Sequence, residues 1–272
     1  MIHTKTAIFR KLQSKDHVLS GTAIKALALG LMVIDHVHQI FYTQGVPAWF
    51  SWLGRPVATL FMFLCAEGFY YTQNRKRYML QLLVGSFLMS GISMGLSRFM
   101  PLESVALINN MFGTLFMSTF YMLMIDLLRT GITARTPGKI LLALGGMILP
   151  WFIGLGMLAV ISKELLSWLW VMLLLFIPNP LIVEGGFALV FMGVLFYILR
   201  KYRLAQMGIV VLIGILSSLT AKNAQWLMVS AIVPMWLYNG QRGRGGKYFF
   251  YIFYPVHLYI LYIIAFLIQR ET

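Results

Sequence analysis

The sequence predicts an all-α fold, a polytopic transmembrane helical bundle of about nine to ten membrane helices. Of its 272 residues, 60% are hydrophobic and 11% are charged, whereas soluble domains have roughly 45–50% and 25%. A soluble core of this size could not absorb so much apolar surface, so these side chains need lipid. Seven Trp, thirteen Tyr and twenty Phe residues fit the aromatic belts of a bilayer protein.

Apolar runs separated by short linkers predict where the helices lie, because a membrane-spanning helix needs about 20 residues. The expected helices cover residues 22–43, 53–72, 77–97, 106–128, 139–160, 165–178, 180–199, 204–221, 224–239 and 247–268. The segment 165–178 is short for a span and is plausible as a re-entrant helix. Because the linkers are so short, any active site must be built from helices and their ends.

The net charge of +14 is explained by topology rather than by nucleic-acid binding. Lys and Arg residues cluster between the apolar runs, as the positive-inside rule requires. With nine spans and a cytoplasmic N-terminus, sixteen Lys and Arg residues lie inside and four outside; with ten crossings the numbers are twelve and eight. The first arrangement follows the rule better, and both stay open.

The chain is expected to form a single integral-membrane domain over residues 1–272, in which residues 1–19 are a basic cytoplasmic segment. Asp35 and His36 interrupt the first apolar run, which favours a retained span over a cleaved signal peptide. Cys65 is the only cysteine, so no disulfide framework is expected.

Ionisable side chains at mid-bilayer cost at least about 2.5–3.5 kcal/mol, so those that are retained there are functional candidates. Few of them occur in the expected helices, and Asn109 and Asn110 are added as polar neighbours. The ionisable candidates are Lys25, Asp35, His36, His38, Arg55, Glu67, Glu184 and His257.

Lys25 and His36 are expected to share one face of the first helix. Their eleven-residue spacing places them about 20° apart around the axis and about 16 Å apart along it. A cation near the cytoplasmic end and an imidazole at mid-depth suit an extended ligand with phosphates at the entrance. The alternative is a snorkelling lysine with a histidine bonded to a neighbouring helix.

The remaining candidates each have two interpretations. Asp35 points about 100° away from His36 and could orient a partner on another helix. Arg55 either neutralises Asp35 or binds substrate, and Glu67 is either a proton acceptor or a tie between helices. His36 and His38 diverge around their helix, and no Cys or carboxylate spacing supports them, so no metal is expected.

Four segments together resemble the TraX family of integral-membrane acetyltransferases. They are KALALGLMVIDHVHQIF from Lys25, LGRPVATLFMFLCAEGFYYTQNRKRY from Leu53, NNMFGTL from Asn109 and YFFYIFYPVHLYILY from Tyr248. They follow the family's order over most of the chain. The spacing of Lys25 and His36 also resembles the basic-x10-His pattern of the broader acyltransferase family 3. One departure is Glu184-Gly185-Gly186, where the family pattern often has an acidic residue, Tyr and Gly.

The resemblance implies a bacterial plasma-membrane enzyme that takes acetyl groups from cytoplasmic acetyl-CoA without a metal. The acceptor it implies is membrane-associated: a pilin N-terminus, a surface glycan or a small amine. Together with the helix geometry, the resemblance suggests that His36 is the general base and that Asp35 and Glu67 are the other catalytic residues. The substrate-binding candidates are Arg55, Asn110, Glu184, Tyr254 and His257, and the candidates for the CoA phosphates are Lys25, Arg75, Lys76 and Arg77.

Two functions of other classes stay open beside the acetyltransferase. A proton-coupled transporter would use Asp35, His36, Glu67 and His257 as a relay, although the sequence has no internal repeat to support it. A non-enzymatic membrane assembly subunit would use its buried polar residues only to specify how the helices pair.

Overall fold

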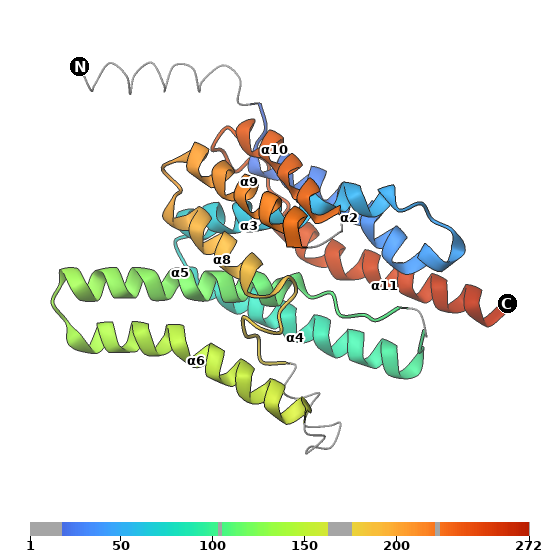
Figure 1. The fold of residues 1–272 in the computed structure, drawn as a ribbon, viewed down its shortest axis with the longest axis horizontal. Coiled ribbons are helices and arrows are strands. Elements are labelled where there is room, and N and C mark those ends of the chain that lie inside the picture. The colour runs from blue at the N-terminus through green and yellow to red at the C-terminus, as the bar shows by residue number, and fades with distance from the viewer. Residues whose placement is uncertain (1–17, 103–104, 163–175, 221–223, 272) are drawn as a thin grey trace. The chain divides into compact units, whose positions relative to one another are not determined.

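The computed structural model describes residues 18–102, 105–162, 176–220 and 224–271, and these are helical apart from linkers and one isolated bridge (Figure 1). The predicted all-α fold is therefore confirmed. The chain forms two compact units: unit 1 comprises Met1–Leu64 and Lys201–Thr272, and unit 2 comprises Cys65–Arg200. The division falls within one helix, α3 (Trp49–Tyr71).

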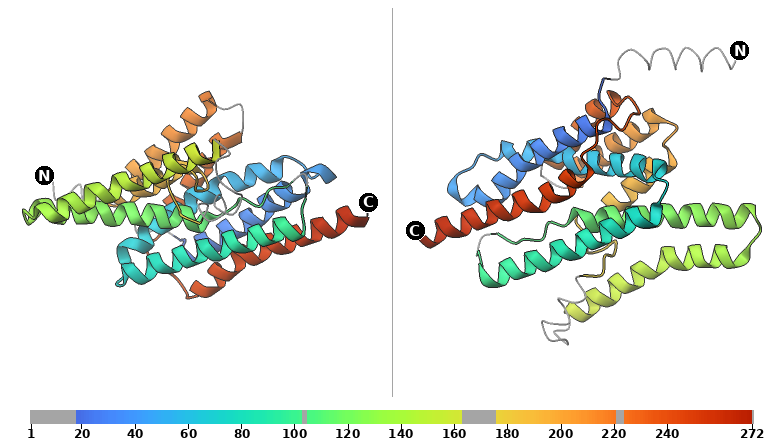
Figure 2. Two further views of the ribbon diagram at one scale, coloured as in Figure 1. Left: turned by 90° about the horizontal axis from the view of Figure 1, so that it is seen from below. Right: turned by 180° about the vertical axis from the view of Figure 1, so that it is seen from behind.

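Unit 1 is built around the contact between its first and last helices, α2 (Gly21–Phe41) and α11 (Lys247–Glu271). These two helices run side by side, drawn blue and red (Figure 2). The rest of the unit is the first part of α3, η1 (Tyr42–Gln44), α9 (Arg203–Thr220), η2 (Ala224–Ala231) and α10 (Ile232–Trp236). Ser20 caps α2 because its hydroxyl accepts from the Ala23 amide at 3.3 Å.

Unit 2 is centred on α5 (Met111–Thr133), which packs against α4 (Arg75–Phe99), α6 (Pro137–Ser162) and α8 (Gly186–Ile198). The α5–α6 hairpin is drawn in two shades of green (Figure 1). Asn74 and Asn110 begin α4 and α5 as N-caps, since their side-chain oxygens accept from the amides of Arg77 and Gly113.

Seven of the described helices are long and apolar enough to cross a membrane. They cover Gly21–Gln44, Trp49–Tyr71, Arg75–Phe99, Met111–Thr133, Pro137–Ala159, Arg203–Thr220 and Tyr248–Arg270, and two shorter apolar helices cover Gly186–Ile198 and Ala224–Trp236. Helix α6 leaves Leu141, Leu142 and Phe152 at least 65% exposed, as lipid-facing side chains would be. The chain is thus built as an integral membrane protein.

Three sequence predictions are corrected or left open by these boundaries. Asn109 and Asn110 precede α5 instead of lying within a helix, because Asn110 is its cap. Glu184 also precedes its helix, since Gly185 and Gly186 adopt positive φ values of 72° and 59°, which favour glycine and delay the start of α8. The expected re-entrant segment 165–178 falls almost wholly outside the described residues.

Candidate active site

A pair of buried histidines joins α2 to α11 in unit 1. His36 Nδ1 lies 2.8 Å from His257 Nε2, and the two residues are 4% and 8% exposed. Their ring planes differ by 5° and their centroids are 4.9 Å apart. With the two nitrogens 2.8 Å apart, the ring centroids are farthest apart when both rings point at each other along the N···N line. The observed centroid distance is close to that limit, so the rings meet edge to edge in a well-aligned hydrogen bond.

The partners of the two rings assign their tautomers. His257 Nδ1 lies 2.8 Å from the Phe253 carbonyl oxygen, and a carbonyl can only accept, so Nδ1 carries the proton. In the neutral ring His257 Nε2 then accepts, and the proton of the shared bond belongs to His36 Nδ1. His36 Nε2 is left as an unprotonated base, held in place by a chain of two hydrogen bonds that ends at the backbone.

Aromatic side chains of α11 enclose this pair and the lysine that precedes it. The Phe253 ring stacks on the His257 ring with centroids 5.1 Å apart. The centroid of the Tyr254 ring lies 6.3 Å from that of His36. The Lys25 ammonium lies 5.6 Å from the centroid of Phe250. Lys25 and His36 thus both face α11, as their eleven-residue spacing predicts.

Asp35 lies where α2 crosses α3, beside the histidine pair in sequence but directed elsewhere. Its carboxylate accepts from Gln39 Nε2 at 2.6 Å. The Arg55 guanidinium acts on Asp35 electrostatically, but donates its hydrogen bonds to Gln225 and Ser51, at 3.2 and 3.4 Å. Arg55 Nε is buried without a hydrogen-bond partner. The direct Asp35–Arg55 ion pair considered from the sequence is therefore not formed.

Gly54 permits this close approach of α2 and α3. A methyl group added at Gly54 would overlap the Cβ and Cγ atoms of Asp35. We expect Gly54→Ala to lower the free energy of unfolding by about 1–3 kcal/mol, the usual cost of overpacking, as measured by thermal unfolding in detergent. Gly30→Ala on α2 is the control, because nothing lies within 4 Å of a methyl there. Equal stability of the two variants would contradict this packing.

Glu67 belongs to unit 2, where it pairs with a cation. Its Oε1 atom lies 3.3 Å from Arg200 Nε, and the two side chains are 6% and 17% exposed. Neither atom makes a hydrogen bond to the other, so the contact is an ion pair by proximity. The Arg200 guanidinium also lies over the Tyr70 ring, 3.6 Å from its centroid.

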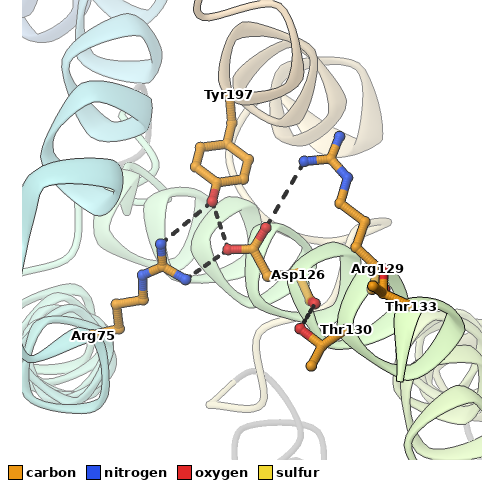
Figure 3. Close-up of polar contacts among 6 residues, drawn as sticks. All are labelled: Arg75, Asp126, Arg129, Thr130, Thr133 and Tyr197. Carbon is orange, nitrogen blue, oxygen red and sulfur yellow. Dashed lines mark hydrogen bonds and ion pairs between the residues drawn. The ribbon is translucent and has the colours of Figure 1, made fainter. Parts of the chain in front are cut away.

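Arg75 is held in a second polar cluster of unit 2, drawn in Figure 3. Its guanidinium lies 2.6 Å from Asp126 Oδ2, and the Tyr197 hydroxyl donates to the same oxygen at 2.6 Å. The Phe69 ring lies 4.6 Å from the guanidinium. Any phosphate bound by Arg75 must therefore compete with Asp126, whereas Lys76 and Arg77 are exposed at the start of α4.

Asn110 and Glu184 both lie at the end of unit 2 where α5 begins. The Asn110 amide donates to Ser86 and Ser90 of α4, at 3.1 and 2.8 Å. The Glu184 backbone carbonyl accepts from the Thr114 hydroxyl at 2.7 Å. Both contacts hold helices together. Among the described residues, no group of three His, Cys, Asp or Glu side chains could hold a metal ion.

Comparison of the chain with known protein families gives a match. The profile of the TraX protein family matches residues 20–265, which include both histidines and every ion pair described above. The chain belongs to the TraX family.

One relative is the probable fimbrial assembly protein FimC, serogroup H1, of Dichelobacter nodosus. It is 25% identical over 266 residues, which cover 91% of this chain and 96% of the relative. No solved structure is significantly similar.

Three residues of this TraX family chain escaped the sequence analysis. Asp126 and Arg200 are not among the candidates that the sequence singles out, although each holds a charged partner. Tyr197, which donates to Asp126, is not distinguished by the sequence from the other tyrosines. A signal for Asp126 existed, because acidic residues number only eight in the chain.

Proposed function

We propose that this protein is a membrane-embedded acetyltransferase that moves an acetyl group from acetyl-CoA to an amine or hydroxyl of a membrane-associated acceptor. The observation that carries the proposal is the chain of two hydrogen bonds from His36 Nδ1 through His257 to the Phe253 carbonyl, which leaves Nε2 of a neutral His36 free of a proton. A general base must be held in one tautomer and orientation, and this chain of hydrogen bonds does both. The TraX family membership supports the same reaction class.

The residues account for the movement of the proton. His36 Nε2 removes the proton of the acceptor's N–H or O–H as that atom attacks the thioester carbonyl carbon. The C–S bond then breaks, and the same proton passes from His36 to the departing sulfur, giving the acetylated acceptor and free CoA. The positive charge that forms on His36 meanwhile is shared through Nδ1 with His257, which acts as a positioning residue. Both His257 nitrogens are engaged, so it is a poor donor to the oxyanion.

The other candidates divide into donor-binding and acceptor-binding roles. Lys25 lies toward the expected cytoplasmic end of the helix that carries His36 and is assigned to the CoA phosphates. The assignment of Arg75, Lys76 and Arg77 of unit 2 to these phosphates stays a prediction from the sequence, and Arg75 is already paired with Asp126. Arg55, with its buried Nε atom unsatisfied, and Tyr254 are assigned to the acceptor or the oxyanion. Asp35 bonds Gln39 where α2 crosses α3 and is assigned to positioning that crossing, and Glu67, Asn110 and Glu184 hold helices.

The relative from Dichelobacter nodosus bears on the acceptor. Its name as a probable fimbrial assembly protein favours a pilin N-terminus over a surface glycan or a small amine. The same name also suits the rival function of a non-enzymatic assembly subunit, so the acceptor and the reaction must be tested together. We place the protein in a bacterial plasma membrane with its N-terminus in the cytoplasm.

The test is acetyl-CoA turnover by the purified protein in detergent. We expect it to bind acetyl-CoA and to release free CoA thiol only when a pilin peptide or an envelope extract is added, with radiolabelled acetyl appearing on the acceptor. Proton flux in liposomes without CoA release would support a transporter instead. Absence of both activities, with intact pilus assembly in cells, would support an assembly subunit.

A further inference from the structure

A basic, glycine-rich loop between α10 and α11 is fixed to the start of α2. We call residues 239–246, NGQRGRGG, the basic loop. Its carbonyl groups cap the first turn of α2: Gln241 O accepts from the Gly21 amide at 2.8 Å and Arg242 O from the Thr22 amide at 3.0 Å. The Thr22 hydroxyl lies 2.8 Å from Arg242 O and 2.7 Å from Arg244 O.

The conformation of the basic loop depends on its glycines. Gly240 and Gly243 have φ values of 77° and 79°, which L side chains rarely adopt. A methyl group at Gly243 would overlap the Ser20 side chain. At the α10 end, Tyr238 packs on Phe63 and against the Arg203 guanidinium, with centroid distances of 5.4 and 5.2 Å. The loop is thereby anchored at both its edges.

The two arginines of the basic loop face outward while its carbonyls face α2. Arg242 and Arg244 are exposed, and no carboxylate of the described residues forms an ion pair with either. Lys25 lies one turn further along α2, about 4.5 Å from Thr22 along the axis. Three cations therefore lie at the start of α2. By the same rise, His36 lies about 21 Å further along this helix than Thr22.

We propose that the basic loop binds the phosphate groups of the acyl-CoA donor through Arg242 and Arg244, together with Lys25. The positive-inside rule explains why cations lie at this end, but it does not require them to be held in one backbone conformation. Arginine presents a planar fork that bonds two phosphate oxygens at once. A phosphate group held here leaves the extended pantetheine arm to reach along α2 toward His36. This inference rests on the proposed function.

The test compares two acetyl donors in the double variant Arg242→Ala/Arg244→Ala. We expect its KM for acetyl-CoA to rise about tenfold or more, as when charge-assisted hydrogen bonds are lost, with kcat retained. S-acetyl-pantetheine lacks the nucleotide phosphates, so its kcat/KM should be unchanged. The control variant Arg135→Gly/Lys139→Ala removes two exposed cations, one from the α5–α6 linker and one from the first turn of α6, and glycine suits the φ of 50° at Arg135. It should leave both donors unaffected.

Equilibrium binding of CoA, measured by titration calorimetry, separates this inference from the proposed function. Weaker CoA binding by the loop variant, with wild-type affinity in His36→Ala, would support the loop even without an identified acceptor. Equal CoA affinity in wild type and loop variant would overturn it. A second result would also overturn it. If wild type is more stable in phosphatidylglycerol nanodiscs than in phosphatidylcholine nanodiscs, and the loop variant loses this difference but keeps its CoA affinity, the arginines bind lipid headgroups instead. No CoA binding by wild type would overturn both proposals.

Discussion

Replacing His36 by alanine is expected to lower kcat for acetyl transfer by about 10²–10⁴-fold, the usual contribution of a general base. The reason is the loss of Nε2, which is unprotonated in the neutral ring and is held in place by the bond between His36 Nδ1 and His257 Nε2. CoA thiol release at saturating acetyl-CoA measures the effect. The KM for acetyl-CoA should change little, because the base acts on the acceptor's proton rather than on the phosphates.

His38→Ala is the matched control for this variant. His38 lies two residues further along α2 and, unlike His36, is only part-buried, so its loss should leave kcat unchanged. His257→Phe keeps an aromatic ring beside Phe253 but removes the hydrogen-bond acceptor of His36 Nδ1, and should lower kcat by less than His36→Ala does. Wild-type kcat in His36→Ala would show that another group is the base, and wild-type kcat in His257→Phe would refute the positioning role.

The histidine pair shows what the sequence could and could not predict about the site. Both residues stood out because ionisable groups are rare in apolar helices, and simple rise per residue placed both well inside the membrane. Their direct hydrogen bond was not predictable, because it depends on how α11 is rotated against α2. That rotation is decided by the packing of many apolar side chains, such as Ile24, Ala28 and Leu258, each of which is at most 1% exposed.

The polar residues near helix ends were predicted less well than the helices themselves. Asn110 was placed inside a helix because the apolar run continues upstream of it, although Asn is a preferred N-cap and accepts here from the Gly113 amide. Arg75 was assigned to phosphate because basic clusters were interpreted together. Its neighbour in space, Asp126, is 51 positions away along the chain, and only the folded structure brings them into contact.

Substitutions at Glu67 and Arg200 are expected to change the stability of the protein strongly. Arg200→Met is expected to lower the free energy of unfolding by about 3–5 kcal/mol, since it takes the counter-charge from a carboxylate that is 6% exposed. The double variant Glu67→Gln/Arg200→Met should recover most of that loss, because replacing both members of a buried ion pair is often nearly neutral. Thermal unfolding of wild type, both single variants and the double variant in one detergent gives the coupling free energy.

The same four proteins decide between the two interpretations of Glu67. If its carboxylate is a tie between helices, the double variant regains both stability and CoA release, since neither residue touches the reacting atoms. We expect that result, because Arg200 is also held over Tyr70 in an arrangement typical of a structural contact. A double variant that is as stable as wild type but has lost turnover would instead make Glu67 part of the catalytic machinery. A double variant as unstable as Arg200→Met would show that the ion pair is not what couples the two side chains.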